Sequence, residues 1–169
     1  EADATRGTLE PRFVECVDVV PTLLDALGIE AAEHRHRIEG RSLQPLLHKV
    51  PPTTPWREFV FSELDYSFRQ ARLILRKDVH QCRAFSLRDA RWRYVYWVDE
   101  PEQLFDLQAD PQEFNDLGRD SATAVVRAAM RDKLLAFLAR RRHRTTLTDA
   151  QVAAGTHSYK KAGVFFGQW

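Results

Sequence analysis

The sequence predicts an α+β fold, in which a small antiparallel sheet of about four strands is covered by one long helix. Between residues 58 and 107, short stretches with an apolar period of two follow one another through tight connections. Such connections favour antiparallel pairing, because a parallel pair needs a long crossover segment. Residues 121–141 then carry the longer apolar period of a helix.

The clearest strand signal lies at residues 91–98. Trp92 and Tyr94 fall on one face of this strand, and Val95 and Trp97 fall on the other. Weaker signals of the same kind occur at residues 58–63, 71–75, 81–87 and 103–107. Turn-forming residues separate these stretches, as expected for successive hairpins.

The helix after the strands has an apolar stripe that can lie across the sheet. Its members are Val126, Met130, Leu134, Phe137 and Leu138. Ahead of it, Asp110, Pro111 and Glu113 have the pattern of another helix start: a capping aspartate, a proline in the first position and a glutamate that closes a capping box. Thr148 and Gln151 form a second capping box, which predicts a short helix near the end of the sequence.

An earlier helix is expected over residues 18–28. Asp18 can cap it, Pro21 falls within its first turn, and Gly28 can supply its stop. A rigid extended linker follows, formed by Pro51, Pro52 and Pro55. We interpret this linker as the boundary between two layers of structure.

Composition limits the classes of function. The net charge is +1, so no global field favours nucleic acid or a membrane surface. No apolar run approaches the roughly 18 residues that a membrane span needs, and no signal peptide is visible. Cys16 and Cys82 form no metal-binding pattern, so reduced thiols and a cytoplasmic location are expected. Met130 is the only methionine, so residue 1 is not an initiator, and the chain is expected to begin within a loop of a longer protein.

The sequence offers no candidate for a catalytic residue or a metal ligand. His34 and His36 lie among arginines in a loop, a setting typical of solvated side chains rather than of ligands. Glu63 and Asp65 could bind a metal or act in acid–base catalysis, but without a partner histidine a charge cluster at a strand end is the preferred interpretation. Cys16 has no neighbouring base and is expected to pack against its helix.

Two features near the end of the sequence indicate binding. The basic run at residues 140–144 could contact an anionic partner, although a solvated helix end or a subunit contact is preferred, because no aromatic side chains are interleaved with it. Phe165, Phe166 and Trp169 would be costly to leave in water. They are the candidate subunit-contact residues, with burial against the chain's own core as the alternative.

Three groups of stretches stand in a distinctive order and spacing. They are residues 17–28 with 40–47, residues 93–96 with 103–107 and 110–117, and residues 144–152 with 163–169. The first two groups resemble the C-terminal region of the sulfatase family, within the alkaline phosphatase superfamily. The third is similar to the phosphonate monoester hydrolase and phosphodiesterase branch of that family. The resemblance covers nearly the whole chain from about Phe13 onward.

The resemblance implies an alkaline-phosphatase-like C-terminal subdomain with three parts. Residues 1–50 would end a larger catalytic α/β domain, and residues 51–144 would form the subdomain of antiparallel sheet and helix. Residues 145–169 would form a tail for subunit or interdomain contacts. The implied partners are the upstream catalytic domain and further copies of the same chain, in a dimer or a tetramer.

The resemblance also implies an activity for the intact protein. This activity would be hydrolysis of phosphonate monoesters, phosphodiesters or sulfate esters, with formylglycine and a divalent metal (Mn or Ca) held upstream of this chain. No residue of the sequence matches the family's nucleophile motif or its metal ligands, so the chain alone is expected to be inactive. The alternative is a free-standing module that uses residues 140–144 for anion binding or oligomerisation.

Overall fold

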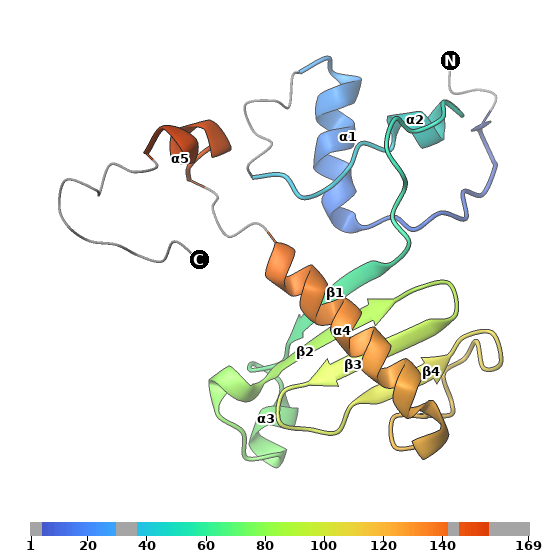
Figure 1. Ribbon diagram of the computed structural model, residues 1–169, viewed down its shortest axis with the longest axis vertical. Helices are drawn as coiled ribbons and strands as arrows, with labels where there is room; N and C mark the ends of the chain where they lie inside the picture. Colours follow the sequence, from blue (N-terminus) through green and yellow to red (C-terminus); the bar gives the residue numbers. More distant parts are fainter. Residues whose placement is uncertain (1–4, 30–36, 142–145, 156–169) are drawn as a thin grey trace. The chain divides into compact units, whose positions relative to one another are not determined.

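The computed structural model describes residues 5–29, 37–141 and 146–155 (Figure 1). These residues belong to two compact units. The first contains Cys16–Val50 and the short helix α5, Asp149–Gly155, and the second contains Thr5–Glu15 and Pro51–Arg141. In the described part of the chain, no helix is both long and apolar enough to cross a membrane. The three-part division expected from the sequence stays a prediction.

The main helix of the first unit is α1, Val19–Ala26, and it ends as predicted. Gly28 has a φ of 67°, and its N–H donates to the carbonyl of Asp25 at 3.1 Å. The N–H of Ile29 donates to the carbonyl of Leu24 at 2.9 Å. Together these bonds form a Schellman motif, in which a glycine with positive φ lets the chain satisfy the last carbonyls of the helix.

Asp18 does not cap α1, contrary to the prediction. It ends the short 3-10 helix η2, Cys16–Asp18, and its own φ of −76° and ψ of −17° are already helical, so its side chain makes no capping bond. Its fully buried carboxylate instead accepts a hydrogen bond of 2.8 Å from the backbone N–H of Arg41. Asp18 therefore fixes the segment that leads into α2, Gln44–Leu47.

The second unit contains the four-stranded antiparallel sheet that the sequence predicts. The strands are ordered β1-β2-β3-β4, so each pairs with its neighbour in the sequence. Their bounds are Val60–Asp65 for β1, Arg83–Arg88 for β2, Trp92–Trp97 for β3 and Gln103–Asp106 for β4. Because alternate side chains point to opposite faces, the sheet has two surfaces with different surroundings.

The long helix α4, Ala124–Arg140, lies across one face of this sheet (Figure 1). The buried core between helix and sheet consists of Leu87, Tyr94, Leu104, Met130 and Leu134. Val126 and Leu138 pack against this core, and the Phe137 ring meets the Phe59 ring edge-on with centroids 5.6 Å apart. The predicted apolar stripe therefore forms the contact between helix and sheet.

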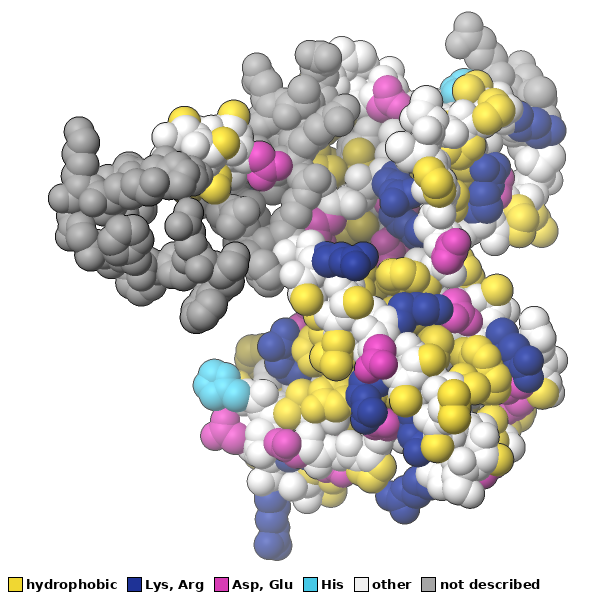
Figure 2. Space-filling model, in the orientation of Figure 1, with side chains coloured by type: hydrophobic (Ala, Val, Ile, Leu, Met, Phe, Trp, Pro, Cys, Tyr) yellow, Lys and Arg dark blue, Asp and Glu magenta, His cyan; other side chains and the backbone are white. Residues whose placement is uncertain are grey.

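Ion pairs surround the exposed side of α4. Lys133 pairs with Asp89 at 2.9 Å, and Arg131 pairs with Glu102 at 3.1 Å. Figure 2 shows basic and acidic side chains interspersed over the face of this unit that carries α4. Exposed pairs of this kind contribute only about 0–1 kcal/mol each, so the apolar core supplies most of the stability of this contact.

One predicted strand is wrong. Residues 71–75 fall in and just after the helix α3, Gln70–Ile74, in the connection between β1 and β2. Such a short apolar run cannot distinguish a strand from a helix by its period. The helix α3 contains good helix formers, including Gln70, Ala71 and Leu73.

The helix predicted to start at Asp110 is a turn. The N–H of Glu113 donates to the carbonyl of Asp110 at 3.1 Å, and Glu113 then adopts a φ of 60°, which a right-handed helix cannot contain. The Asp110 carboxylate accepts the N–H of Asn115 at 2.7 Å instead of capping a helix. Glu113 also pairs with Arg93 of β3 at 2.6 Å, an interaction that favours the turn.

The capping box predicted near the end of the sequence is confirmed. The N–H of Thr148 donates to the side-chain oxygen of Gln151 at 2.8 Å. In return, the N–H of Gln151 donates to the Thr148 hydroxyl at 3.2 Å. These reciprocal bonds satisfy donors at the start of α5, so this helix begins where the sequence indicates.

Candidate functional site

The face of the sheet opposite α4 carries a cavity of about 600 Å³. Leu64 of β1, Trp97 of β3 and Gln103 of β4 contribute to its lining and alternate with the side chains that face α4. The other lining residues come from the connections around the strands and are Tyr66, Arg69, Ala71, Leu75, Glu100, Pro101, Asp116 and Arg119.

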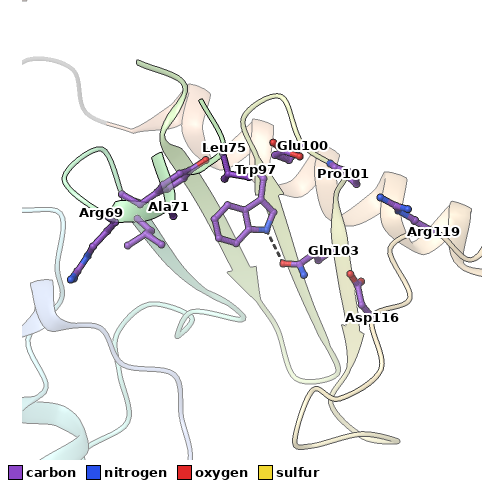
Figure 3. Close-up of a pocket in the computed structure, with 11 residues that line it drawn as sticks. Arg69, Ala71, Leu75, Trp97, Glu100, Pro101, Gln103, Asp116 and Arg119 are labelled. Carbon is purple, nitrogen blue, oxygen red and sulfur yellow. Dashed lines mark hydrogen bonds between the residues drawn. The ribbon is translucent and has the colours of Figure 1, made fainter. Parts of the chain in front are cut away.

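Trp97 lies in the middle of the labelled side chains of the cavity (Figure 3). Its indole N–H donates to the side-chain oxygen of Gln103 at 2.7 Å. The ring of Tyr66 meets the indole edge-on, with centroids 5.8 Å apart. The hydrogen bond and the ring contact fix the indole, which therefore offers a rigid apolar surface.

Tyr66 carries a polar group that has no partner among the described residues. The residue is only 5% exposed, and its hydroxyl is buried without a hydrogen bond. Its backbone is anchored, because its N–H donates to the carbonyl of Cys82 at 2.9 Å. An unsatisfied buried hydroxyl costs about 1–3 kcal/mol, so a polar group from outside this chain that bonded to it would be stabilising.

Both carboxylates at the cavity are already engaged. Glu100 pairs with the ammonium group of Lys77 at 2.9 Å, and this hydrogen bond raises the pKa of Lys77. Asp116 accepts the backbone N–H groups of Leu104 and Gly118 at 3.1 and 2.8 Å. These two acidic groups therefore serve the protein's own structure.

Two arginines at the cavity are not neutralised in this way. Neither Arg69 nor Arg119 forms an ion pair within the described part of the chain. Figure 3 shows them at opposite ends of the labelled row, Arg69 with its guanidinium pointing away from Trp97 and Arg119 next to Asp116. The charge available to a partner at this cavity is therefore positive.

A second concavity, of about 420 Å³, shares three lining residues with the first on the same face of the sheet. Arg93 lies within it, pairs with Glu113 at 2.6 Å and donates to the Ser86 hydroxyl at 3.2 Å. Its polar groups are therefore paired with one another. In the first cavity, the Tyr66 hydroxyl and two arginines have no partner among the described residues, so this cavity is the better candidate for a binding site.

No metal site is found among the described residues, because no three His, Cys, Asp or Glu side chains gather closely enough to hold an ion. His34 and His36 lie outside these residues. Cys16 is exposed, contrary to the packing expected for it, whereas Cys82 is buried and its thiol donates to the carbonyl of Asp78 at 3.3 Å. The described residues therefore show no group of ligands for a divalent metal, and no reaction step is assigned to them.

The carboxylate pair near the end of β1 is a charge cluster, as interpreted from the sequence. Glu63 pairs with Arg83 and, at 3.3 Å, with Arg141, while Asp65 accepts a backbone hydrogen bond of 2.8 Å. Arg141 belongs to the basic run, whose residues 142–144 lie outside the described ones. The described end of the basic run therefore contributes to the contact between α4 and β1.

The predicted subunit-contact residues, Phe165, Phe166 and Trp169, also lie outside the described residues. The cavity beside Trp97 is built from residues that the sequence did not single out as a site. One signal for it was available: residues 66–77 contain four cationic residues and no acidic one. Three of the four are arginines, a residue type that is enriched in protein contact surfaces.

Four antiparallel strands in sequence order beneath one long helix define the α+β subdomain of alkaline-phosphatase-like hydrolases. The chain belongs to the family described as N-sulphoglucosamine sulphohydrolase, C-terminal, which it matches over residues 2–140. The resemblance to the C-terminal region of sulfatases is thereby confirmed.

Two curated relatives illustrate this membership. The chain is 36% identical over 125 residues to the multifunctional alkaline phosphatase superfamily protein PehA of Trinickia caryophylli, a match that covers 71% of this chain and 23% of PehA. It is 35% identical over 114 residues to the choline-sulfatase of Rhizobium meliloti, covering 68% of this chain and 19% of that protein. The chain therefore spans less than a quarter of the length of these two relatives.

Solved structures agree with the fold. The phosphonate monoester hydrolase of Agrobacterium radiobacter matches with a TM-score of 0.72 and 29% identity, over 86% of this chain and 29% of that one. The phosphonate monoester hydrolase of Silicibacter pomeroyi matches with a TM-score of 0.73 and 30% identity, over the same shares, 86% and 29%. The α+β fold predicted from the sequence is therefore confirmed.

Proposed function

We propose that this chain is the C-terminal portion of a metal-dependent hydrolase of phosphonate monoesters, phosphodiesters or sulfate esters. The observation that carries the proposal is the extent of the match to PehA, which covers 71% of this chain but only 23% of PehA. The names of the other relatives, a choline-sulfatase and phosphonate monoester hydrolases, support the range of esters. The preferred ester is left to experiment.

In this proposal the chain completes the fold of a larger protein. Val20 and Leu23 of α1 and Leu27 at its end are all more than half exposed, so the helix presents an apolar face that the described residues leave uncovered. An amphipathic helix gains stability when such a face is buried against another layer. We assign that layer to an upstream catalytic α/β domain of the same polypeptide.

The nucleophile and the metal belong to the upstream portion in this proposal. The residues after Cys16 are Val17 and Asp18, which do not match the motif in which formylglycine forms. A divalent metal, Mn or Ca, would likewise need ligands from upstream. The residues of this chain then act by positioning and stabilising the catalytic domain rather than by touching the ester.

The decisive experiment compares the 169-residue chain with the longer gene product that contains it. Both are assayed with an aryl phosphonate monoester, a phosphodiester and an aryl sulfate, before and after treatment with a chelator. We expect hydrolysis by the longer protein only, and its loss on chelation. Hydrolysis by the 169-residue chain would contradict the proposal that the catalytic centre lies in the upstream portion. A folded longer protein that cleaves none of the three esters would remove the assigned class.

We also propose that the protein forms homo-oligomers in the cytoplasm, with Phe165, Phe166 and Trp169 in a subunit contact. The free-energy cost of leaving three aromatic rings in water supports this role. The alternative, an anion-binding module based on residues 140–144, has less support, because Arg141 already pairs with Glu63. Retention of the chain on a heparin column that weakens steeply with salt would favour the alternative.

A further inference from the structure

The connection between β1 and β2, together with the residues that flank it, exposes a concentrated apolar surface. The exposed large apolar side chains here are Leu64, Phe68, Leu73, Ile74, Leu75 and Val79. Phe68 is 98% exposed and Ile74 is 72% exposed. Leu64 and Leu75 also line the cavity beside Trp97. We call these exposed side chains, together with the cavity, the α3 surface. Contiguous apolar surface of this kind marks a site of association.

The α3 surface is held in place by polar contacts behind it. The ammonium group of Lys77 donates to the carbonyl of Val98 at 2.8 Å and pairs with Glu100 at 2.9 Å. Asp78 then caps the 3-10 helix η4, Val79–Gln81, through a complete capping box. These bonds tie the connection to the turn between β3 and β4. A surface ordered in advance loses little conformational entropy when a partner binds.

The charge of the α3 surface defines the chemistry of its partner. Residues 65–78 contain four cationic residues and two acidic ones, Asp65 and Asp78, which accept backbone hydrogen bonds at the two ends of the segment. Arg69 forms no ion pair among the described residues. Arg119, at the other end of the cavity, likewise forms no ion pair with a described residue (Figure 3). The buried hydroxyl of Tyr66 also lacks a partner within the part of the chain that the structure describes. A matching segment would therefore present apolar side chains flanked by carboxylates, and a polar group for Tyr66.

We propose that the α3 surface docks the upstream portion of the full-length protein through a segment of that composition. This inference rests on the proposed function, because it requires an upstream portion. The chain spans 23% of PehA, so a protein of similar size would have most of its surface outside this chain. A second copy fits less well, because a symmetric contact between two α3 surfaces would bring their arginines together.

The first test is covalent footprinting of solvent-exposed side chains on the full-length protein and on the 169-residue chain. We expect labelling of Phe68 and Ile74 to fall several-fold in the full-length protein relative to the shorter chain. Val125, which is exposed on α4 on the opposite face of the sheet, is the matched control and should label equally in both. Equal labelling of Phe68 in both proteins would overturn the proposal.

Labelling at decreasing protein concentration distinguishes a contact with the upstream portion from a contact with a second copy. Protection of Phe68 should persist at concentrations at which sedimentation shows only monomers. Protection that disappears as oligomers dissociate would assign the contact to a second copy and overturn the proposal. A Phe68→Asp variant of the full-length protein should restore labelling at Ile74, whereas Val125→Asp should not. If Ile74 stays protected in both variants, the proposed docking is contradicted.

Ester hydrolysis by the same full-length sample tells the two proposals apart. If Phe68 is protected but the protein cleaves no phosphonate, phosphodiester or sulfate ester, the docking stands and the proposed activity falls. If the protein cleaves one of these esters and Phe68 labels freely, the activity stands and the docking falls.

Discussion

At the scale of single residues, three carboxylates of this chain hold loops in place. Asp18 accepts the N–H of Arg41, and Asp116 accepts two backbone N–H groups next to β4. Glu113 pairs with Arg93 from a turn with positive φ. A carboxylate that binds backbone N–H groups satisfies donors that a loop leaves unpaired. These three carboxylates therefore have structural roles in the loops that they hold.

Asp106 gives a prediction about pH. It accepts a hydrogen bond of 2.8 Å from Arg91 and one of 3.1 Å from the N–H of Gln108. The hydrogen bond from Arg91 is the main reason why the pKa of Asp106 is lowered in the folded protein. A lowered pKa stabilises the fold above the unfolded value of about 3.9, and this stability is lost as the pH falls through the folded value.

We therefore expect the wild-type chain to lose stability against urea when the pH is lowered below about 4, in part because Asp106 becomes protonated. The Asp106→Asn variant should be less stable than the wild type at pH 7, and the difference should shrink as the pH is lowered toward 2. Urea unfolding measured at several pH values checks this expectation. A difference that stays constant with pH would show that the charge of Asp106 is not responsible.

At the scale of elements, the contact between α4 and the sheet determines the stability of the second unit. Leu134 is 2% exposed in this contact, whereas the next residue, Leu135, is 56% exposed on the same helix. We expect Leu134→Ala to lower the free energy of unfolding by about 2–4 kcal/mol, because it leaves a cavity in a packed core. Leu135→Ala is the matched control and should cost less than about 1 kcal/mol. Equal effects in chemical denaturation would contradict the assigned packing.

The elements also show how far the sequence alone can predict this fold. The strand β3 and the helix α4 were predictable, because their apolar periods are long enough to be distinctive. The residues of α3 were assigned to a strand because five residues cannot define a period. The turn at Asp110 imitates a helix start, and only the positive φ of Glu113 separates the two.

The candidate site was less predictable than the fold for a physical reason. Trp97, Tyr66 and Arg119 line one cavity only because β3, the connection before β2 and the segment after β4 come together on one face of the sheet. No local pattern links residues so far apart in the sequence. The cationic residues at 66–77 are a local pattern, and a local pattern does not show that a cavity lies beside it.

At the scale of the whole molecule, each compact unit presents an apolar surface that the described residues leave exposed. The first unit presents the face of α1 that includes Val20 and Leu23, and the second presents the α3 surface around Phe68. Monomeric soluble proteins rarely expose large contiguous apolar patches. Both surfaces are therefore consistent with the proposal that the chain functions as part of a longer polypeptide, which would contribute the missing layers.

The aromatic tail makes a separate prediction at this scale. Deleting residues 165–169 from the full-length protein should shift it to a smaller oligomer, because Phe165, Phe166 and Trp169 would bury apolar area at about 25 cal/mol per Å² in a subunit contact. Sedimentation velocity over a range of concentrations measures the change in mass. Gln168→Ala is the matched control and should leave the oligomer as it is. If the deletion leaves the mass unchanged but lowers the melting temperature at every concentration, the tail instead packs on its own chain, since only an intersubunit contact depends on concentration.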